Sequence, residues 1–181
     1  MIYINKLNNI LKFHISSFIF CCILGTLLHF AFNWSNNNIF IASLSAINES
    51  TWEHLKLAFF PMLLTTIFGY FYFGKNFSNY LCARLSAIIM AISFITISFY
   101  TYTGILGTNF AFLNITIFYI SILLGELTSF KKLFSNNICR KIISFAILLI
   151  ILFGFVIFTY FPPKINYFKD PITNSYGFFK N

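Results

Sequence analysis

Charged side chains are scarce in this chain: only 9% of its 181 residues are Asp, Glu, Lys or Arg, and only four of those are acidic. Soluble domains carry about 25% charged residues, which form a polar surface around the core. With 59% hydrophobic residues, this chain cannot cover a water-facing globule with polar groups. The composition therefore excludes an ordinary soluble domain and predicts an integral membrane protein of one domain.

Cysteine is also sparse, and the four cysteines form no C-x-x-C or Cys/His motif, which excludes a zinc ribbon or a thioredoxin-like site. Cys21 and Cys22 lie inside an apolar run, so we interpret them as small apolar residues. Cys82 and Cys139 fall on the side that we assign to the cytoplasm, so we expect both to stay reduced.

The net charge of +8 does not indicate a nucleic-acid partner, because such binding requires a clustered basic face. The densest cluster, Lys131 and Lys132 with Arg140 and Lys141, is short and lies between two membrane segments. The expected partner is the lipid bilayer, and a membrane protein partner or a homo-oligomer stays open.

Five apolar runs are long enough to cross a bilayer core of about 30 Å, which requires about 20 helical residues. The predicted helices lie near 13–32, 55–73, 81–102, 110–127 and 142–161. The first run exceeds the apolar core of a signal peptide and ends in no A-x-A-like site, so we interpret it as a helix. The sequence predicts an all-α integral membrane bundle over 1–161.

Two further segments complete the predicted organisation. The apolar segment 39–47 precedes the second helix and is too short to span, so it is re-entrant, interfacial or packed against the bundle. The tail, 162–181, carries turn signals such as Pro162-Pro163 and Asp170-Pro171. We expect this tail to pack on the extracytoplasmic side of the bundle.

Basic residues predict the orientation, because Lys and Arg are retained on the cytoplasmic side. A cytoplasmic N-terminus places Lys6, Lys12, Lys75, Arg84, Lys131, Lys132, Arg140 and Lys141 inside, and Lys56, Lys164, Lys169 and Lys180 outside. The reverse orientation would expose the basic loops. The prediction is N-in/C-out in the cytoplasmic (plasma) membrane.

Polar and ionisable residues concentrate in the stretch 48–56, directly before the second predicted span. Ser50 and Glu53 match a capping box, in which the Ser50 hydroxyl accepts from the Glu53 amide and the Glu53 carboxylate reaches back to Ser50. Trp52 suits an aromatic belt, and Lys56 can pair with Glu53 or extend outward to the membrane surface. This interpretation makes the stretch a helix start.

Capping does not explain His54 beside Lys56, and ionisable groups near the bilayer either function or pair with one another. On a helix, His54 points about 100° away from Glu53, so Glu49, Glu53 and His54 of this helix alone make a poor metal chelate. A metal site would have to recruit His29 from the first span, and Asp170 from the tail is a further candidate. A histidine–glutamate hydrogen bond is the alternative.

The candidate outer-facing pocket comprises His29, Asn48, Glu49, Trp52, Glu53, His54, Lys56 and Asp170. No catalytic residue and no cofactor are predicted, but His29, His54 and Glu53 are the candidate ligands of a divalent metal.

Three isolated residues also have predicted roles. Pro61 removes an amide from the second helix, which creates either a polar notch or a packing bend. Glu126 ends the fourth predicted helix near Lys75, Lys131 and Lys132, so we expect an interfacial ion pair. A proton-relay role for Glu126 is the alternative, which nothing else in the sequence supports, and we expect His14 to be interfacial.

Two motifs, N-E-S-x-W-E-H-x-K at 48–56 and D-P-x-T-x-x-Y-G at 170–177, resemble an uncharacterised family of small bacterial integral membrane proteins, a domain of unknown function. The resemblance covers essentially the whole chain and implies a multi-helix plasma-membrane protein without an assigned activity. It also implies that the tail and the 48–56 stretch belong together.

Three functions stay open at this stage. The outer-facing pocket binds or passes a small solute, ion or lipid group; or His29 and His54 with a carboxylate form a metal-dependent intramembrane hydrolase; or the chain is a structural or accessory subunit.

Overall fold

The computed structural model describes residues 2–135 and 139–179, with side chains from residue 7 onward. Within these ranges the chain forms α1 (Ile2–Trp34), α2 (Ile39–Ala42), α3 (Thr51–Tyr72), α4 (Tyr80–Leu106), α5 (Ala111–Leu133) and α6 (Lys141–Tyr160), with 3-10 turns η1 (Gly74–Asn76) and η2 (Asn166–Phe168). All but α2 are long and apolar enough to cross a membrane. The predicted all-α fold with five spanning helices is confirmed, and the chain is a multi-pass membrane protein.

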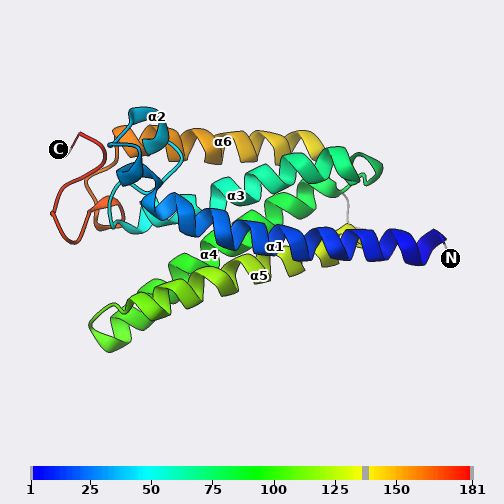
Figure 1. Ribbon diagram of the computed structural model, residues 1–181, viewed down its shortest axis with the longest axis horizontal. Helices are drawn as coiled ribbons and strands as arrows, with labels where there is room; N and C mark the ends of the chain where they lie inside the picture. The colour runs from blue at the N-terminus through cyan, green and yellow to red at the C-terminus, as the bar shows by residue number, and fades with distance from the viewer. Residues whose placement is uncertain (1, 136–138, 180–181) are drawn as a thin grey trace.

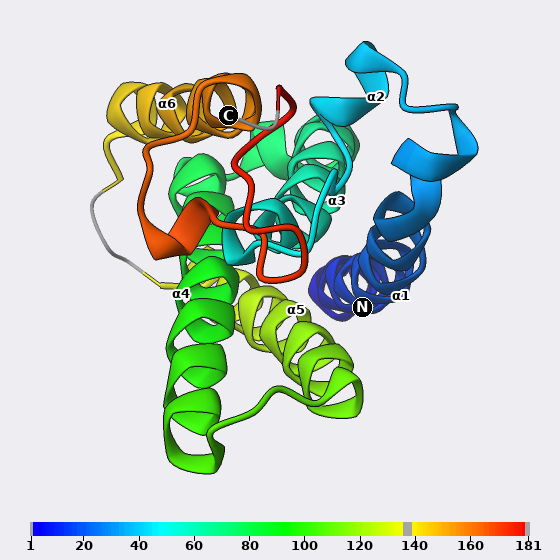
Figure 2. The same ribbon diagram turned by 90° about the vertical axis from the view of Figure 1, so that its left-hand side faces the viewer.

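The five long helices run back and forth along one axis (Figure 1). The start of α1, the η1 turn, the end of α5 and the start of α6 lie at one end, which we call the amino end (Figure 1). The α2 segment, the α4–α5 turn and the C-terminal tail lie at the other, which we call the tail end. Figure 2 shows that α4 and α5 diverge from α3 and α6 toward the tail end.

Helix α3 is the most enclosed of the five, with 61% of its most apolar segment buried against 17–39% in the others. Its Ala58, Phe59 and Met62 belong to the main core cluster with Ala87 and Ile88 of α4. The outer helices expose many large apolar side chains, as expected where lipid replaces water as the solvent. The polar stretch that precedes α3 is therefore attached to the centre of the bundle.

Pro61 lies inside α3 and cannot donate to the Leu57 carbonyl one turn earlier. Gly25 of α1 packs against that carbonyl so closely that a Cβ on Gly25 would lie 2.5 Å from the Leu57 oxygen. The absence of a side chain lets α1 cover the freed carbonyl. Of the two alternatives for Pro61, the structure therefore favours close packing over a polar notch.

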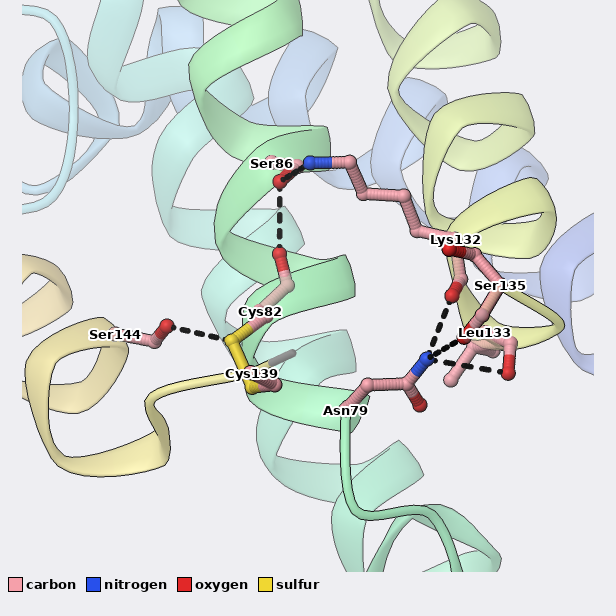
Figure 3. Close-up of a disulfide and its surroundings, with 8 residues drawn as sticks. All are labelled: Asn79, Cys82, Ser86, Lys132, Leu133, Ser135, Cys139 and Ser144. Atoms are coloured by element: carbon pink, nitrogen blue, oxygen red, sulfur yellow. Dashed lines mark hydrogen bonds between the residues drawn. A yellow bond between two sulfur atoms is a disulfide. The ribbon is translucent and has the colours of Figure 1, made fainter. Parts of the chain in front are cut away.

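A disulfide joins Cys82 of α4 to Cys139, just before α6, with the Cα atoms 5.9 Å apart (Figure 3). The expectation that both stay reduced is wrong in this structure, and 57 residues of sequence separation gave no signal for the pairing. Cys82 Sγ also lies 3.0 Å from the Ser144 hydroxyl of α6. Cys21 and Cys22 are free, as expected for apolar filling of α1.

The short segment 39–47 before α3 does not span the membrane but contacts other parts of the tail end. Asn38 caps the single turn of α2 by accepting from the Phe40 amide at 2.8 Å. Tyr160, the last residue of α6, donates to the Ile39 carbonyl at 2.5 Å and accepts from Ser43 at 2.7 Å. Of the three options for 39–47, packing against the bundle agrees with these contacts.

Candidate functional site

The two outer histidines meet one glutamate where α1 ends and α3 begins. His29 comes from the last turns of α1, His54 from the first turn of α3, and Glu49 from the loop before it. Glu49 Oε2 lies 3.4 Å from His54 Nε2, and its Oε1 lies 3.9 Å from His29 Nε2. One donor atom from each residue falls within 4.8 Å of the others, a spacing that could hold a metal ion. We call this group the His–Glu site.

The tautomer of His54 is fixed by the backbone. His54 Nδ1 lies 2.9 Å from the Ser50 carbonyl oxygen, which can only accept, so Nδ1 carries the hydrogen. In a neutral imidazole, Nε2 then presents a lone pair toward the Glu49 carboxylate, which is itself an acceptor. Two acceptors face each other at hydrogen-bond range, so the arrangement requires a proton or a metal cation between them.

The His–Glu site is open to solvent rather than sealed in the bundle. Both histidine side chains are 32% exposed, and the Glu49 side chain is 45% exposed. The pKa of the Glu49 carboxyl is lowered, chiefly through its hydrogen bond with His54 in the proton-bound state, although partial burial opposes this effect. A small cation could therefore reach Glu49 in its ionised form.

The start of α3 positions this site through a partial capping box. Ser50 is the N-cap, and its hydroxyl accepts from the Glu53 amide at 3.4 Å. The reciprocal half of the prediction is wrong, because the Ser50 amide donates to Asn48 at 3.0 Å and the Glu53 carboxylate instead accepts from the Ile47 amide at 3.2 Å. Asn48 thus shapes the turn that carries Glu49 rather than entering the His–Glu site.

Glu53 and Lys56 form a separate, buried ion pair. Their charged atoms lie 2.5 Å apart, and the side chains are 2% and 0% exposed. Lys56 Nζ also donates to the Ala42 carbonyl at 2.8 Å and to the Thr159 hydroxyl at 2.9 Å. The expected pairing at i,i+3 is present, but Lys56 does not extend outward, because it ties α3 to α2 and α6. Glu53 is therefore bound to Lys56, and Glu49, rather than Glu53, is the carboxylate beside His29 and His54.

Trp52 and Asp170 contribute to packing and to the tail. Trp52 packs against Phe155 of α6 and Phe168 of η2, with ring centroids 4.6 and 4.9 Å apart. Asp170 is buried and accepts from the Ile172 amide at 3.0 Å and the Thr173 hydroxyl at 2.6 Å. These contacts close a turn inside the tail, so Asp170 does not join the His–Glu site.

A second group of ionisable side chains lies inside the bundle, nearer the amino end. The Glu126 carboxylate of α5 meets His14 of α1 at 2.6 Å and Arg84 of α4 at 2.8 Å. All three side chains are at most 5% exposed. The expected lysine partners of Glu126 are therefore wrong, because it pairs with His14 and Arg84 instead. The cause is Arg84, which lies inside α4 and neutralises Glu126 there rather than serving as a loop charge.

Sequence reasoning missed this interior cluster because its members are 42 and 112 residues apart. The available signal was that Arg84, Glu126 and His14 all fall within or beside apolar runs, where an unpaired charge is costly and a partner is expected.

Comparison with known families gives a match over residues 1–178 to a family model described as "Family of unknown function (DUF6512)". The chain belongs to this family, so the resemblance to a family without an assigned function is confirmed. No curated protein and no solved structure matches the chain.

Proposed function

We propose that this membrane protein binds a divalent transition-metal ion at the His–Glu site. The observation that carries the proposal is the convergence of His29, Glu49 and His54, with the lone pair of His54 Nε2 directed at a carboxylate. A cation between these atoms removes the unfavourable facing of two acceptors. Of the ligands considered for the outer-facing pocket, namely a small solute, an ion or a lipid group, this proposal selects an ion.

The spacing suits a small ion after a modest closure. Bonds of about 2.0–2.1 Å in tetrahedral geometry place donor atoms about 3.3 Å apart. The distance of 3.4 Å from His54 Nε2 to Glu49 Oε2 is already close to this value. His29 Nε2 lies 3.9 Å from the other oxygen, Oε1, so His29 and Glu49 must approach for all three residues to bind one ion. The half-exposed Glu49 side chain is free to turn between the two rings.

The donor set favours the Zn²⁺ class over Mg²⁺ or Ca²⁺. Imidazole nitrogen suits zinc, copper, nickel and iron, whereas magnesium and calcium take oxygen ligands. The Ser50 carbonyl, which holds His54 through Nδ1, is the kind of outer partner that orients metal-ligating histidines.

We further propose the N-in/C-out orientation in the cytoplasmic membrane, in which the His–Glu site faces the extracytoplasmic side. Support comes from the charges: Lys75 and Arg140 lie in or beside the connections of the amino end, and Lys131, Lys132 and Lys141 lie in the adjacent last or first turns of α5 and α6. Retention of basic loops in the cytoplasm then places the tail end outside. The same orientation places the Cys82–Cys139 disulfide on the cytoplasmic side, where disulfides are rare, so this bond counts against it.

The test is metal titration of the purified protein in detergent after removal of bound metal with a chelator. We expect one Zn²⁺ per chain by competition with a chromophoric chelator. Since removal even of an outer partner costs about 10–100-fold in affinity, His29→Ala, Glu49→Gln and His54→Ala should each weaken binding by about 100-fold or more. Asp170→Asn is the matched control, because it removes a carboxylate at the same end without touching the site.

Equal Zn²⁺ affinity in the wild-type protein and all three ligand variants would refute the proposal. So would a loss of affinity in Asp170→Asn as large as in Glu49→Gln.

A hydrolase is the second candidate function. Three protein ligands at a half-exposed site leave a fourth coordination position for water, as in catalytic zinc centres. Turnover of ester or peptide substrates by zinc-loaded protein, abolished in His54→Ala, would support it. Stoichiometric zinc binding without such turnover would leave metal binding alone as the function.

A further inference from the structure

The interior cluster of His14, Arg84 and Glu126 lies away from the His–Glu site and has a chemistry of its own. It joins α1, α4 and α5 across the bundle, and each member is at least 95% buried. Ionisable groups inside a membrane are costly unless they pair, and they commonly bind ions or protons.

The hydrogen bonds define the charge of the cluster. Glu126 Oε2 accepts from Arg84 Nη1 at 2.8 Å, and Oε1 accepts from the Ser17 hydroxyl at 2.7 Å. Arg84 Nε donates to the Thr66 hydroxyl at 3.1 Å, and Nη2 donates to the Thr65 hydroxyl at 2.8 Å and to the Met62 carbonyl at 3.4 Å. Arginine is always protonated, and the carboxylate accepts from every side, so these two groups form an ion pair with no net charge.

His14 is the group whose bonding is incomplete. Its Nδ1 lies 2.6 Å from Glu126 Oε2, which is an acceptor, so Nδ1 carries a hydrogen. Its Nε2 is buried and has no hydrogen-bond partner. The other buried unpartnered side-chain atoms in the described part are Trp52 Nε1 and Ser129 Oγ, so His14 Nε2 is the one base among them.

We propose that His14 binds and releases a proton at Nε2, which makes this cluster an intramembrane proton-binding site. The proton converts a neutral cluster into one of charge +1. The Glu126 carboxylate favours the imidazolium, whereas the Arg84 guanidinium on the same carboxylate oxygen opposes it. Phe13 and Phe130 are in T-shaped contact with the imidazole ring, with centroids 5.6 Å away. The other titratable groups in this interior are Arg84 and Tyr80 of α4 and Cys21 of α1.

The cluster contains the kinds of group, a histidine and a carboxylate, that occur in intramembrane proton relays. A base is held by a carboxylate and a permanent cation balances that carboxylate, so proton uptake changes the charge by one unit without leaving an anion unpaired. Ser17 adds a hydroxyl one turn from His14 on the same helix, and Cys21 and Thr65 continue the polar groups along α1 and α3 at 3.9 Å from each other.

The test uses nitrogen NMR of the histidine ring in a single-histidine protein. The chain has three histidines, so His29→Gln plus His54→Gln leaves His14 as the only one and removes the proposed metal ligands. This protein, labelled with ¹⁵N-histidine in lipid nanodiscs, is titrated over about two pH units on either side of 6.5, the usual histidine value. The outcome of this test is therefore independent of whether the His–Glu site binds a metal.

We expect the Nε2 resonance to move from the lone-pair to the protonated position as the pH falls, while Nδ1 stays protonated throughout. Adding Glu126→Gln should lower the midpoint by about 1 pH unit or more, because an adjacent opposite charge favours the charged form by that amount. Adding Ser17→Ala, which leaves both ionic contacts intact, should move the midpoint by less than Glu126→Gln and in the opposite direction, because it exposes more of the carboxylate charge to His14.

A single Nε2 position across the whole range would overturn the proposal, as would a midpoint unchanged by Glu126→Gln. If the Glu126→Gln variant does not fold, titration of the single-histidine protein and of its Ser17→Ala variant tests the proposal. A lower titration midpoint in the Ser17→Ala variant would then contradict it.

Discussion

The buried pair of Glu53 and Lys56 gives the strongest stability prediction. Lys56 Nζ has three partners, namely Glu53, the Ala42 carbonyl and the Thr159 hydroxyl, which match the three hydrogens of an ammonium group. Lys56→Met keeps an apolar side chain of similar length and removes the ammonium group, with its charge and its three hydrogen-bond donors. Glu53 is then left as a buried anion with the Ile47 amide and Thr159 as its remaining partners.

Removing one member of a buried ion pair costs about 3–5 kcal/mol, because the other charge stays uncompensated. We expect Lys56→Met to lower the free energy of unfolding by that amount. Glu53→Gln in the same protein removes the stranded charge but keeps an acceptor for the Ile47 amide, so the double variant should recover most of the loss. The coupling between the two substitutions is therefore predicted to be about 2 kcal/mol or more.

The assay is reversible unfolding in mixed micelles of increasing SDS content, followed by the fluorescence of the two tryptophans, Trp34 and Trp52, of which Trp52 packs within this region. Lys164→Met is the matched control, since Lys164 is exposed in the tail and its loss should change stability by less than about 0.5 kcal/mol. If Lys56→Met and Lys164→Met unfold alike, or if the double variant is no more stable than Lys56→Met, the buried pair is not what holds the tail end together.

Three further predictions follow from single contacts. Gly25→Ala places a Cβ 2.5 Å from a backbone oxygen of α3 and should cost about 1–3 kcal/mol in the same assay, whereas Gly104→Ala, with open space around it, should be neutral. Glu49 has a lowered pKa, so its contribution to stability is present above its ordinary value of 4.5 and is lost as the pH falls through the lower folded value; Glu49→Gln should remove that part of the pH dependence. Protein purified without reductant should expose no thiol at Cys82 or Cys139 to maleimide until it is reduced, and prompt labelling of either would contradict the disulfide.

The sequence was sufficient for the architecture because membrane spans are determined by local composition. Runs of about 20 apolar residues carry their own signal, and the five spans follow from it. Their ends are less predictable: α1 begins at Ile2 rather than near 13, and α5 extends to Leu133 rather than 127, since a helix continues past the apolar run as long as its backbone can bond.

The partners of the ionisable groups could not be predicted in the same way. Helical geometry correctly paired Lys56 with Glu53, because both lie on α3. It could not select Glu49 over Glu53 for His29, nor bring Arg84 to Glu126, because those choices depend on how separate helices are placed. Composition indicates that a buried charge needs a partner, but only tertiary structure identifies which one.

The bond between Cys82 and Cys139 encloses most of α4 and all of α5 in a covalent ring that closes at the amino end. The bond therefore holds the first turn of α4 beside the start of α6 at the amino end. At the opposite end α4 and α5 diverge from α3 and α6 (Figure 2). The covalent constraint thus lies at the amino end, beside the basic loops, and the diverging helix ends lie at the tail end, which carries His29 and His54.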